Sequence, residues 1–216
     1  EMQKLKDIIK KHDLYLIADE VYREFCYDSV PFHSAMELKD VEQNVILIDS
    51  ISKRYSACGI RIGALVSRNK QVMETAMKFA MARLSPPSLG QVAGEAIIDT
   101  PDSYFTEVYK NYLDRRNYIV NAMNAIPNVR CLMPRGAFYT IAQLPIDDTD
   151  TFCQWLLSDF EYQNQTVMLA PATGFYASPG LGKNEVRIAY VLKTEDLKKA
   201  VKCIEEALKI YPGRTK

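Results

Sequence analysis

The stretch SISKRYSACGIRIG, Ser50–Gly63, sets Lys53 directly after two serines and eight residues before Arg61. It follows the apolar run NVILIDS at 44–50, which predicts a buried strand. Ligands of open α/β sheets bind beyond the carboxyl ends of the strands, so Lys53 is expected at such an edge. An amine there can attack a carbonyl group when it is partly desolvated or beside another cation, and Arg61 supplies that cation.

The same stretch predicts an anion site. The Arg61 guanidinium can bind a phosphate through two parallel hydrogen bonds, and the hydroxyls of Ser50 and Ser52 add donors. Gly59 and Gly63 allow the backbone to come close to the bound group. Spacing alone favours a plainer alternative, a solvated Lys–Arg loop, because serine, lysine and glycine are common loop residues.

A second group of candidates is the segment ADEVY at 18–22. Asp19 closes the predicted strand LYLIAD at 14–19, where its carboxylate can keep a ring nitrogen protonated. Capping a following helix is an equal alternative for Asp19. Tyr22 can donate a hydrogen bond to a phenolate-like oxygen, although a partly buried aromatic ring with a solvated hydroxyl is the simpler interpretation.

Hydrophobic periodicity divides the chain into two parts. The first, residues 1–120, is predicted as α/β with a mostly parallel sheet whose strands are covered on both faces, followed by a long connecting helix. The second, residues 121–216, is predicted as a smaller α+β domain. The expected strands are 14–19, 44–50, 62–67, 129–133, 137–144 and 186–192, and the main helices are 70–84, 88–98, 102–126, 149–160 and 194–210.

Composition restricts the class of function. Lys plus Arg and Asp plus Glu are equal at 27 each, so no overall field favours nucleic acid or an anionic membrane. The five cysteines lack metal-ligand spacing and fit reduced thiols, which indicates a cytoplasmic protein. His12 and His33 have no neighbours that would complete a metal site, and no apolar run is long enough to span a bilayer.

Three motifs together resemble the class I/II aminotransferases, fold-type I pyridoxal-phosphate enzymes that include aspartate aminotransferase. They are ADEVY at 18–22, S-x-S-K-x-Y-x-x-x-G-x-R-x-G at 50–63 and NEVRIAYVL at 184–192, in that order and at compatible separations. The resemblance covers essentially the entire chain. Family members are nearly twice as long, and their phosphate loop, ring-stacking aromatic residue and asparagine have no counterpart here. The resemblance therefore implies the C-terminal portion of such an enzyme.

The resemblance also implies roles. Lys53 would bind pyridoxal 5'-phosphate covalently and act as acid and base, Asp19 would pair with the ring nitrogen, and Tyr22 with the ring oxygen. Ser50, Arg61 and, as an addition, Ser52 would hold the phosphate. The remaining position, Arg187, would bind the substrate carboxylate; the alternative there is a solvated arginine on an edge strand.

Substrate and partners follow from the resemblance alone. The leading expectation is amino transfer between an aspartate-like amino acid and a 2-oxo acid such as 2-oxoglutarate, in a homodimer. The residues 1–216 by themselves are expected to bind the cofactor weakly and to catalyse little. A lyase or an aminocyclopropanecarboxylate synthase type of enzyme, and a regulatory ligand-binding domain of the same fold, are the alternatives.

Overall fold

The computed structural model describes residues 1–215, which form two compact units. Unit 1 is Glu1–Thr106 and unit 2 begins at Glu107. The division lies inside the long helix α5, Asp102–Asn124. The boundary expected from the sequence, 120/121, lies further along the same helix. The assignment of the two parts as a large and a small domain stays a prediction.

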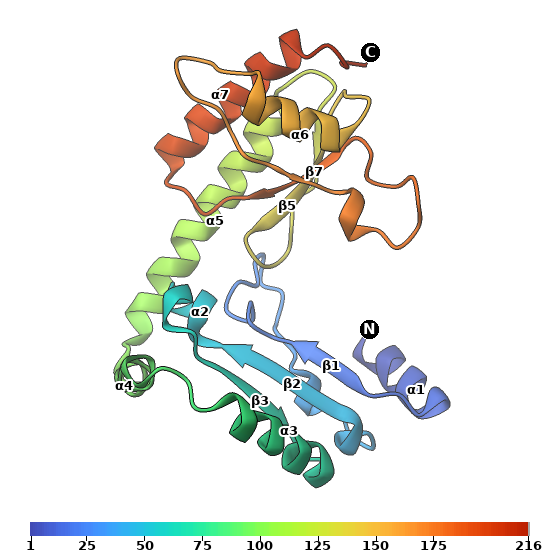
Figure 1. Ribbon diagram of the computed structural model, residues 1–216, viewed down its shortest axis with the longest axis vertical. Coiled ribbons are helices and arrows are strands. Elements are labelled where there is room, and N and C mark those ends of the chain that lie inside the picture. The colour runs from blue at the N-terminus through green and yellow to red at the C-terminus, as the bar shows by residue number, and fades with distance from the viewer. Residues whose placement is uncertain (216) are drawn as a thin grey trace. The chain divides into compact units, whose positions relative to one another are not determined.

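Unit 1 alternates helices and strands (Figure 1). Its strands pair in the order β1-β2-β3; α1 precedes β1, the short α2 lies between β2 and β3, and α3 and α4 follow β3. The elements are α1 Met2–His12, β1 Leu16–Asp19, β2 Val45–Ser50, α2 Ile51–Arg54, β3 Gly63–Ser67, α3 Lys70–Arg83 and α4 Ser88–Ala96.

The direction of β3 adds an antiparallel strand to this part of the sheet, a detail that the sequence did not predict. β1 and β2 are parallel, with Asp19 opposite Ile48, but β3 runs antiparallel to β2, with Gly63 opposite Ser50. A parallel crossover needs a long connection, usually with a full helix. The segment 51–62 contains only the four-residue α2 and a short 3-10 turn, so the chain returns alongside β2 in the opposite direction.

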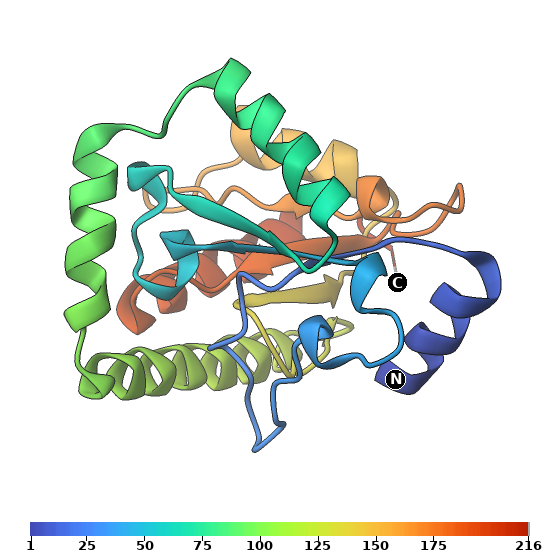
Figure 2. The ribbon, with the colours of Figure 1, turned by 90° about the horizontal axis from the view of Figure 1, so that it is seen from below.

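Burial of the strands also differs from the expectation of strands covered on both faces. β2 begins buried, whereas four of the five residues of β3 are exposed. Helix α3 lies over β2 and β3 (Figure 2), but an open cavity of ≈ 660 Å³ is lined by all three elements. Within the residues described, open space rather than side chains therefore lies against much of β3.

Helix α1 is anchored on the other flank of unit 1. Ile9 is 4% exposed, and the helix ends at Asp13 in a left-handed conformation that reverses the chain into β1. Burial of this apolar stripe fixes β1 and β2 side by side. The buried cluster consists of Ile9, Ala35, Leu38, Val41 and Val45, with Met2, Leu16, Ala18 and Met36 packed against it.

Unit 2 is an antiparallel sheet with helices, as the α+β prediction requires. Its strand order is β4-β5-β7-β6, in which the two-residue β6 is an addition to the predicted strands. Helix α7 has the bounds that periodicity predicts. The elements are β4 Arg130–Cys131, β5 Tyr139–Gln143, α6 Thr149–Ser158, β6 Ala170–Pro171, β7 Glu185–Ala189 and α7 Thr194–Ile210.

The two faces of this second sheet differ. Thr140 and Ala142 on β5 are buried together with their partners Ile188 and Val186 on β7. The alternate residues point to the opposite face, because side chains alternate along a strand. Arg187 is on that opposite face, paired with Ile141.

Candidate active site

Three predicted site segments meet at one edge of the unit 1 sheet. Asp19 ends β1 and Ser50 ends the parallel strand β2, so both stand at carboxyl ends. The antiparallel β3 begins at this same edge, because Gly63 pairs with Ser50. Arg61 comes two residues before Gly63. Because β3 is antiparallel to β2, Arg61 just before β3 lies at the same sheet edge as Lys53 just after β2.

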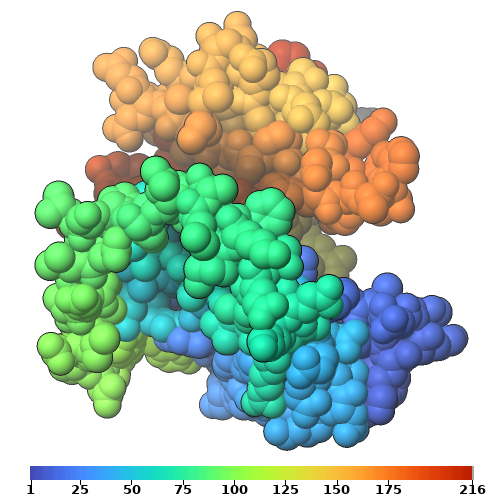
Figure 3. All heavy atoms as spheres, turned by 60° about the horizontal axis from the view of Figure 1, so that its bottom comes forward, coloured from blue at the N-terminus to red at the C-terminus, as the bar shows by residue number. Residues whose placement is uncertain are grey.

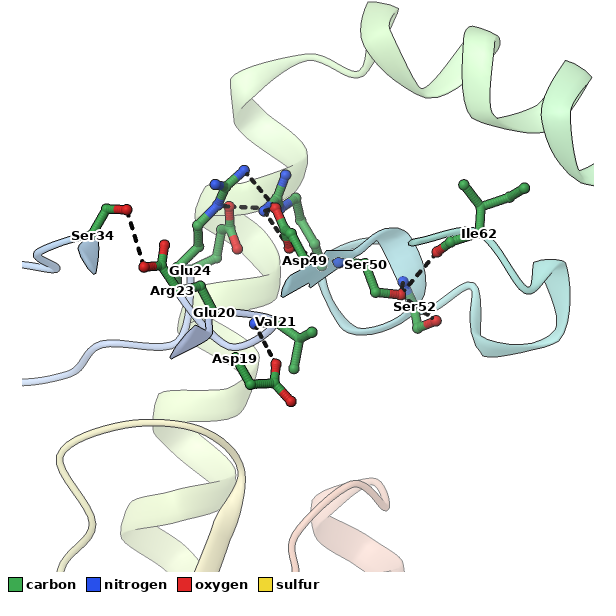
Figure 4. Close-up of polar contacts among 11 residues, drawn as sticks. Asp19, Glu20, Val21, Arg23, Glu24, Ser34, Asp49, Ser50, Ser52 and Ile62 are labelled. Atoms are coloured by element: carbon green, nitrogen blue, oxygen red, sulfur yellow. Dashed lines mark hydrogen bonds and ion pairs between the residues drawn. The ribbon is translucent and has the colours of Figure 1, made fainter. Parts of the chain in front are cut away.

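The serine hydroxyls of the lysine segment bind one another. Ser50 caps α2: its Oγ accepts a hydrogen bond from the Ser52 N–H at 3.1 Å. The two Oγ atoms are 2.7 Å apart, and Ser50 Oγ is 3.0 Å from the Ile62 carbonyl oxygen (Figure 4). Because a hydroxyl has one hydrogen, Ser52 donates to Ser50, which donates to Ile62. Rotation of these hydroxyls would free donors for an anion.

Lys53 lies on the single turn of α2 and is half-buried. Its Nζ donates a long hydrogen bond, 3.9 Å, to the Sγ of Cys58. That thiol in turn donates to the Ser52 carbonyl oxygen at 3.3 Å. The amine therefore lies over the loop that connects β2 with β3.

Arg61 adopts a left-handed backbone conformation, with φ 62°. Its Nη1 donates to the Cys58 carbonyl oxygen at 2.8 Å, which leaves the other guanidinium donors available to a ligand. Arg61 and Ser50 line the same open cavity beneath α3. Figure 3 shows a hollow beside the green atoms of α3 on this face.

Asp19 is the last residue of β1, and Tyr22 belongs to the turn that follows. The Oδ1 of Asp19 accepts a hydrogen bond from the Val21 N–H at 3.2 Å, so it stabilises a turn rather than capping a helix. The Asp19 side chain is exposed, which leaves its second oxygen open to solvent. The ring of Tyr22 is half-buried and packs edge-on against Phe25, 6.4 Å between centroids.

Four charged residues behind this edge form a compact cluster, the Arg54 cluster: Arg23, Glu24, Asp49 and Arg54 (Figure 4). The Nε of Arg54 is 2.6 Å from Glu24 Oε1, and its Nη2 is 3.0 Å from Asp49 Oδ2. Arg23 contacts the same two carboxylates, each at 3.2 Å. The cluster joins the turn after β1 to the end of β2 and to the residue after Lys53.

Two members of the cluster are largely shielded from water, with 14% of the Arg54 side chain and 16% of that of Asp49 exposed, whereas Arg23 and Glu24 are 34% and 29% exposed. Burial by itself lowers the pKa of Arg54, but the adjacent Glu24 and Asp49 outweigh it and raise that pKa overall. Nearby, Glu20 is buried and accepts hydrogen bonds from Ser34 Oγ at 3.0 Å and Ala35 N at 2.7 Å. The charges of Arg54, Glu24 and Asp49 are therefore balanced within the Arg54 cluster, and the Glu20 carboxylate is stabilised by the hydrogen bonds from Ser34 and Ala35.

Arg187 in unit 2 has an aromatic environment. Its guanidinium carbon lies 4.7 Å from the centroid of the Tyr139 ring and 4.5 Å from that of Phe175. Rings hold a guanidinium by its faces and leave the N–H groups at its edge for a carboxylate. Arg187 also borders an open cavity of ≈ 670 Å³ beside α7, whose walls are mainly apolar and carry none of the other predicted site residues.

Within residues 1–215, no cluster of His, Cys, Asp and Glu has the geometry to bind a metal ion. The helices of that same span are all too short or too polar to traverse a bilayer.

Comparison with known proteins decides the family. The profile of the aminotransferase class I and II family matches residues 1–204. This chain belongs to that family. The resemblance seen in the three motifs is thereby confirmed, as is the fold that it implied.

Individual relatives show how far the similarity extends. The chain is 28% identical to an aspartate aminotransferase of Rhizobium meliloti, over 95% of this chain and 51% of the relative. It is 29% identical to an aspartate aminotransferase of Pyrococcus horikoshii, over 94% and 51%. The crystal structure of an aromatic aminotransferase from Pyrococcus horikoshii superposes with a TM-score of 0.83 at 25% identity, covering 96% of this chain and 54% of that one. The chain thus spans about half the length of the relatives that it matches.

Two features of this aminotransferase edge were missed by the sequence reasoning. The Arg54 cluster is one, although the charged residues at the ends of two predicted strands were a usable signal. The contact of Lys53 with Cys58 is the other, and it depends on the shape of a 3-10 turn that has no clear periodicity. Neither the assigned roles of the seven predicted residues nor their joint geometry across the two units is tested by these comparisons, so both stay predictions.

Proposed function

We propose that this chain carries part of the active site of a pyridoxal 5'-phosphate-dependent aminotransferase, with Lys53 as its catalytic residue. The observation that supports this most is the shared sheet edge, where the strand end of Asp19, the lysine turn after Ser50 and the arginine before Gly63 converge. Membership of the aminotransferase family agrees with this chemistry.

The donor set fits a phosphorylated aromatic aldehyde. Arg61 and Ser50 line one cavity, and their guanidinium and hydroxyl groups are suited to a phosphate. Ser52 becomes an additional donor when its hydroxyl turns away from Ser50. The exposed carboxylate of Asp19 would hold a proton on the ring nitrogen, and the hydroxyl of Tyr22 would donate to the ring oxygen.

When bound, the cofactor supplies an electron sink for the bond pair released at the substrate α-carbon. Lys53 Nζ would take the proton from the substrate α-carbon as a general base and later give it up as a general acid. The Asp19 carboxylate would keep the ring nitrogen protonated, and that positive charge would make removal of the α-proton easier. The Arg54 cluster keeps the turn that carries Lys53 against the ends of β1 and β2.

Arg187 would bind the α-carboxylate of the substrate. Its guanidinium is held between Tyr139 and Phe175, so its planar edge is pre-organised for two parallel hydrogen bonds. We propose an aspartate-like amino donor and a 2-oxo acid such as 2-oxoglutarate as acceptor, because the relatives at 28% and 29% identity are named aspartate aminotransferases. A homodimer in the cytoplasm completes the proposal, and the five free cysteines agree with a reducing compartment.

The test is selective labelling of Lys53. The chain is incubated with pyridoxal 5'-phosphate, reduced with borohydride, digested and analysed by mass spectrometry. We expect phosphopyridoxyl label concentrated at Lys53 and weakened by Arg61→Met, with Lys70→Met as a control for a distant exposed cation. Label spread evenly over the lysines of the chain would refute the proposal.

A further inference from the structure

Of the five cysteines, Cys58 has the thiol that is most accessible to a dissolved oxidant. It is exposed, whereas Cys26 is half-buried and the other three cysteines are buried. Burial raises the pKa of those four thiols, Cys26, Cys131, Cys153 and Cys203. The thiolate is the form that attacks an oxidant, so these four are comparatively protected.

The backbone holds this thiol close to the amine of Lys53. The Ala57 N–H donates to the Ser52 carbonyl oxygen at 2.9 Å, which closes the loop between the two side chains. Arg61 fixes the Cys58 carbonyl from the other side at 2.8 Å. The Nζ–Sγ separation is 3.9 Å, and the flexible lysine stem can shorten it by rotation about its own bonds.

We propose that Lys53 and Cys58 form a reversible sulfur–nitrogen bond when the protein meets a hydroperoxide. The two side chains make up an oxidative modification site formed by a nucleophilic amine and an exposed thiol in contact.

Two steps balance this reaction. In the first, the Cys58 thiolate attacks a peroxide oxygen: the S–O bond forms, the O–O bond breaks, sulfur gives up two electrons, and the leaving hydroxide or alkoxide takes up a proton and departs as water or an alcohol. In the second, the neutral Lys53 amine attacks the sulfenic sulfur: the N–S bond forms, the S–O bond breaks, and the hydroxyl leaves as water with an amine proton. Two molecules of an added thiol return the free amine and thiol while becoming a disulfide.

The consequence is that oxidation of Cys58 would control whether the Lys53 amine is free to react. A sulfur-bound Nζ cannot condense with an aldehyde, so oxidation would disable Lys53. The block would be reversible, because the bond to nitrogen forms before Cys58 is oxidised irreversibly. This regulatory consequence rests on the proposed function above, whereas the bond itself depends only on the contact between the two side chains.

The experiment treats the full chain with dilute hydrogen peroxide, alkylates the remaining thiols and digests with trypsin. We expect the peptide that ends at Arg54 to be joined to the peptide 55–61, two hydrogen atoms lighter than their sum. Dithiothreitol should release it. The link should vanish in Cys58→Ser and in Lys53→Met, and persist in the matched control Cys26→Ser.

A second arm separates this inference from the proposed function. Oxidation should abolish borohydride-trapped pyridoxal phosphate at Lys53 in the native chain, and dithiothreitol should restore it, whereas Cys58→Ser should keep the label. Cys58 found only as sulfinic acid or as an intermolecular disulfide overturns the inference and leaves the aminotransferase proposal standing. A linked peptide without selective labelling supports the bond and refutes that proposal.

Discussion

Helix α4 contains two glycines whose replacement by alanine is expected to have opposite effects. Gly90 and Gly94 are both helical, and alanine improves helix propensity by about 1 kcal/mol at either one. A Cβ on Gly94 meets nothing within 4 Å. Gly94→Ala should therefore stabilise α4 by roughly 0.5–1 kcal/mol, through the lower entropy of the unfolded chain.

At Gly90 the new Cβ would lie 2.6 Å from the backbone carbonyl oxygen of Ile60 and 3.1 Å from its Cγ2. Ordinary contact begins at 3.4 Å, so α4 or the turn at 58–60 must shift by 0.8 Å, the difference between 3.4 and 2.6. Overpacking of this kind costs about 1–3 kcal/mol. After the gain in propensity, Gly90→Ala should destabilise the contact by up to about 2 kcal/mol, which puts the two variants roughly 1–3 kcal/mol apart.

The assay is amide hydrogen exchange followed by mass spectrometry on peptides from α4 and from the 51–62 segment. Since each 1.4 kcal/mol is tenfold in an opening equilibrium, Gly90→Ala should speed exchange by up to about thirty-fold while Gly94→Ala slows it. Trp155, the one tryptophan, lies in unit 2, and its fluorescence serves as a separate reference for that unit. Equal protection in both variants would refute the close approach of α4 to Ile60.

Further predictions concern charge, core and pH. Arg54→Met should destabilise unit 1 by about 2 kcal/mol, because Glu24 and Asp49 then keep only Arg23 as a cationic partner, whereas exposed Lys70→Met should change stability by less than about 0.5 kcal/mol; exchange in β1 and β2 reports both. Phe152→Ala, at a fully buried position of α6, should cost about 3–5 kcal/mol in urea unfolding followed by tryptophan fluorescence. Burial and the carboxylate of Asp147 raise the pKa of Tyr211 to about 12, so its stabilising contribution is complete below pH 10 and is lost as pH rises through 12. Unfolding at pH 9–12 should show this loss in the native chain and not in Tyr211→Phe.

Hydrophobic periodicity predicted the bounds of those helices whose ends are specified by their own residues. Helix α7 begins at Thr194 and ends at Ile210 as expected, since acidic residues in its first turn and a continuous apolar stripe specify both ends. Helix α3 agrees to within one residue at its end. These elements depend on local sequence, which a single chain reveals directly.

Features that depend on distant partners were harder to predict. The apolar run of β3 is the same whichever way the strand points, so its pattern could not reveal the antiparallel pairing with β2. Likewise, the sequence alone does not distinguish Arg54 from other charged residues, because its partner Glu24 lies 30 residues earlier and only the fold brings the two within 2.6 Å. Ser50, Lys53 and Arg61 of the motif at 50–63 lie in one local unit, while two of the charged residues that support it, Arg23 and Glu24, lie outside the motif.

The antiparallel return of β3 has a kinetic consequence. Ser50, Lys53 and Arg61 all lie within the segment that the Ser50–Ile62 hydrogen bond closes, so bringing them together requires only a short loop closure. Asp19 joins them only when β1 pairs with β2 across a much longer stretch of chain. The segment that carries Ser50, Lys53 and Arg61 can therefore assemble early from contacts of low sequence separation, and Asp19 joins it in a later, slower event.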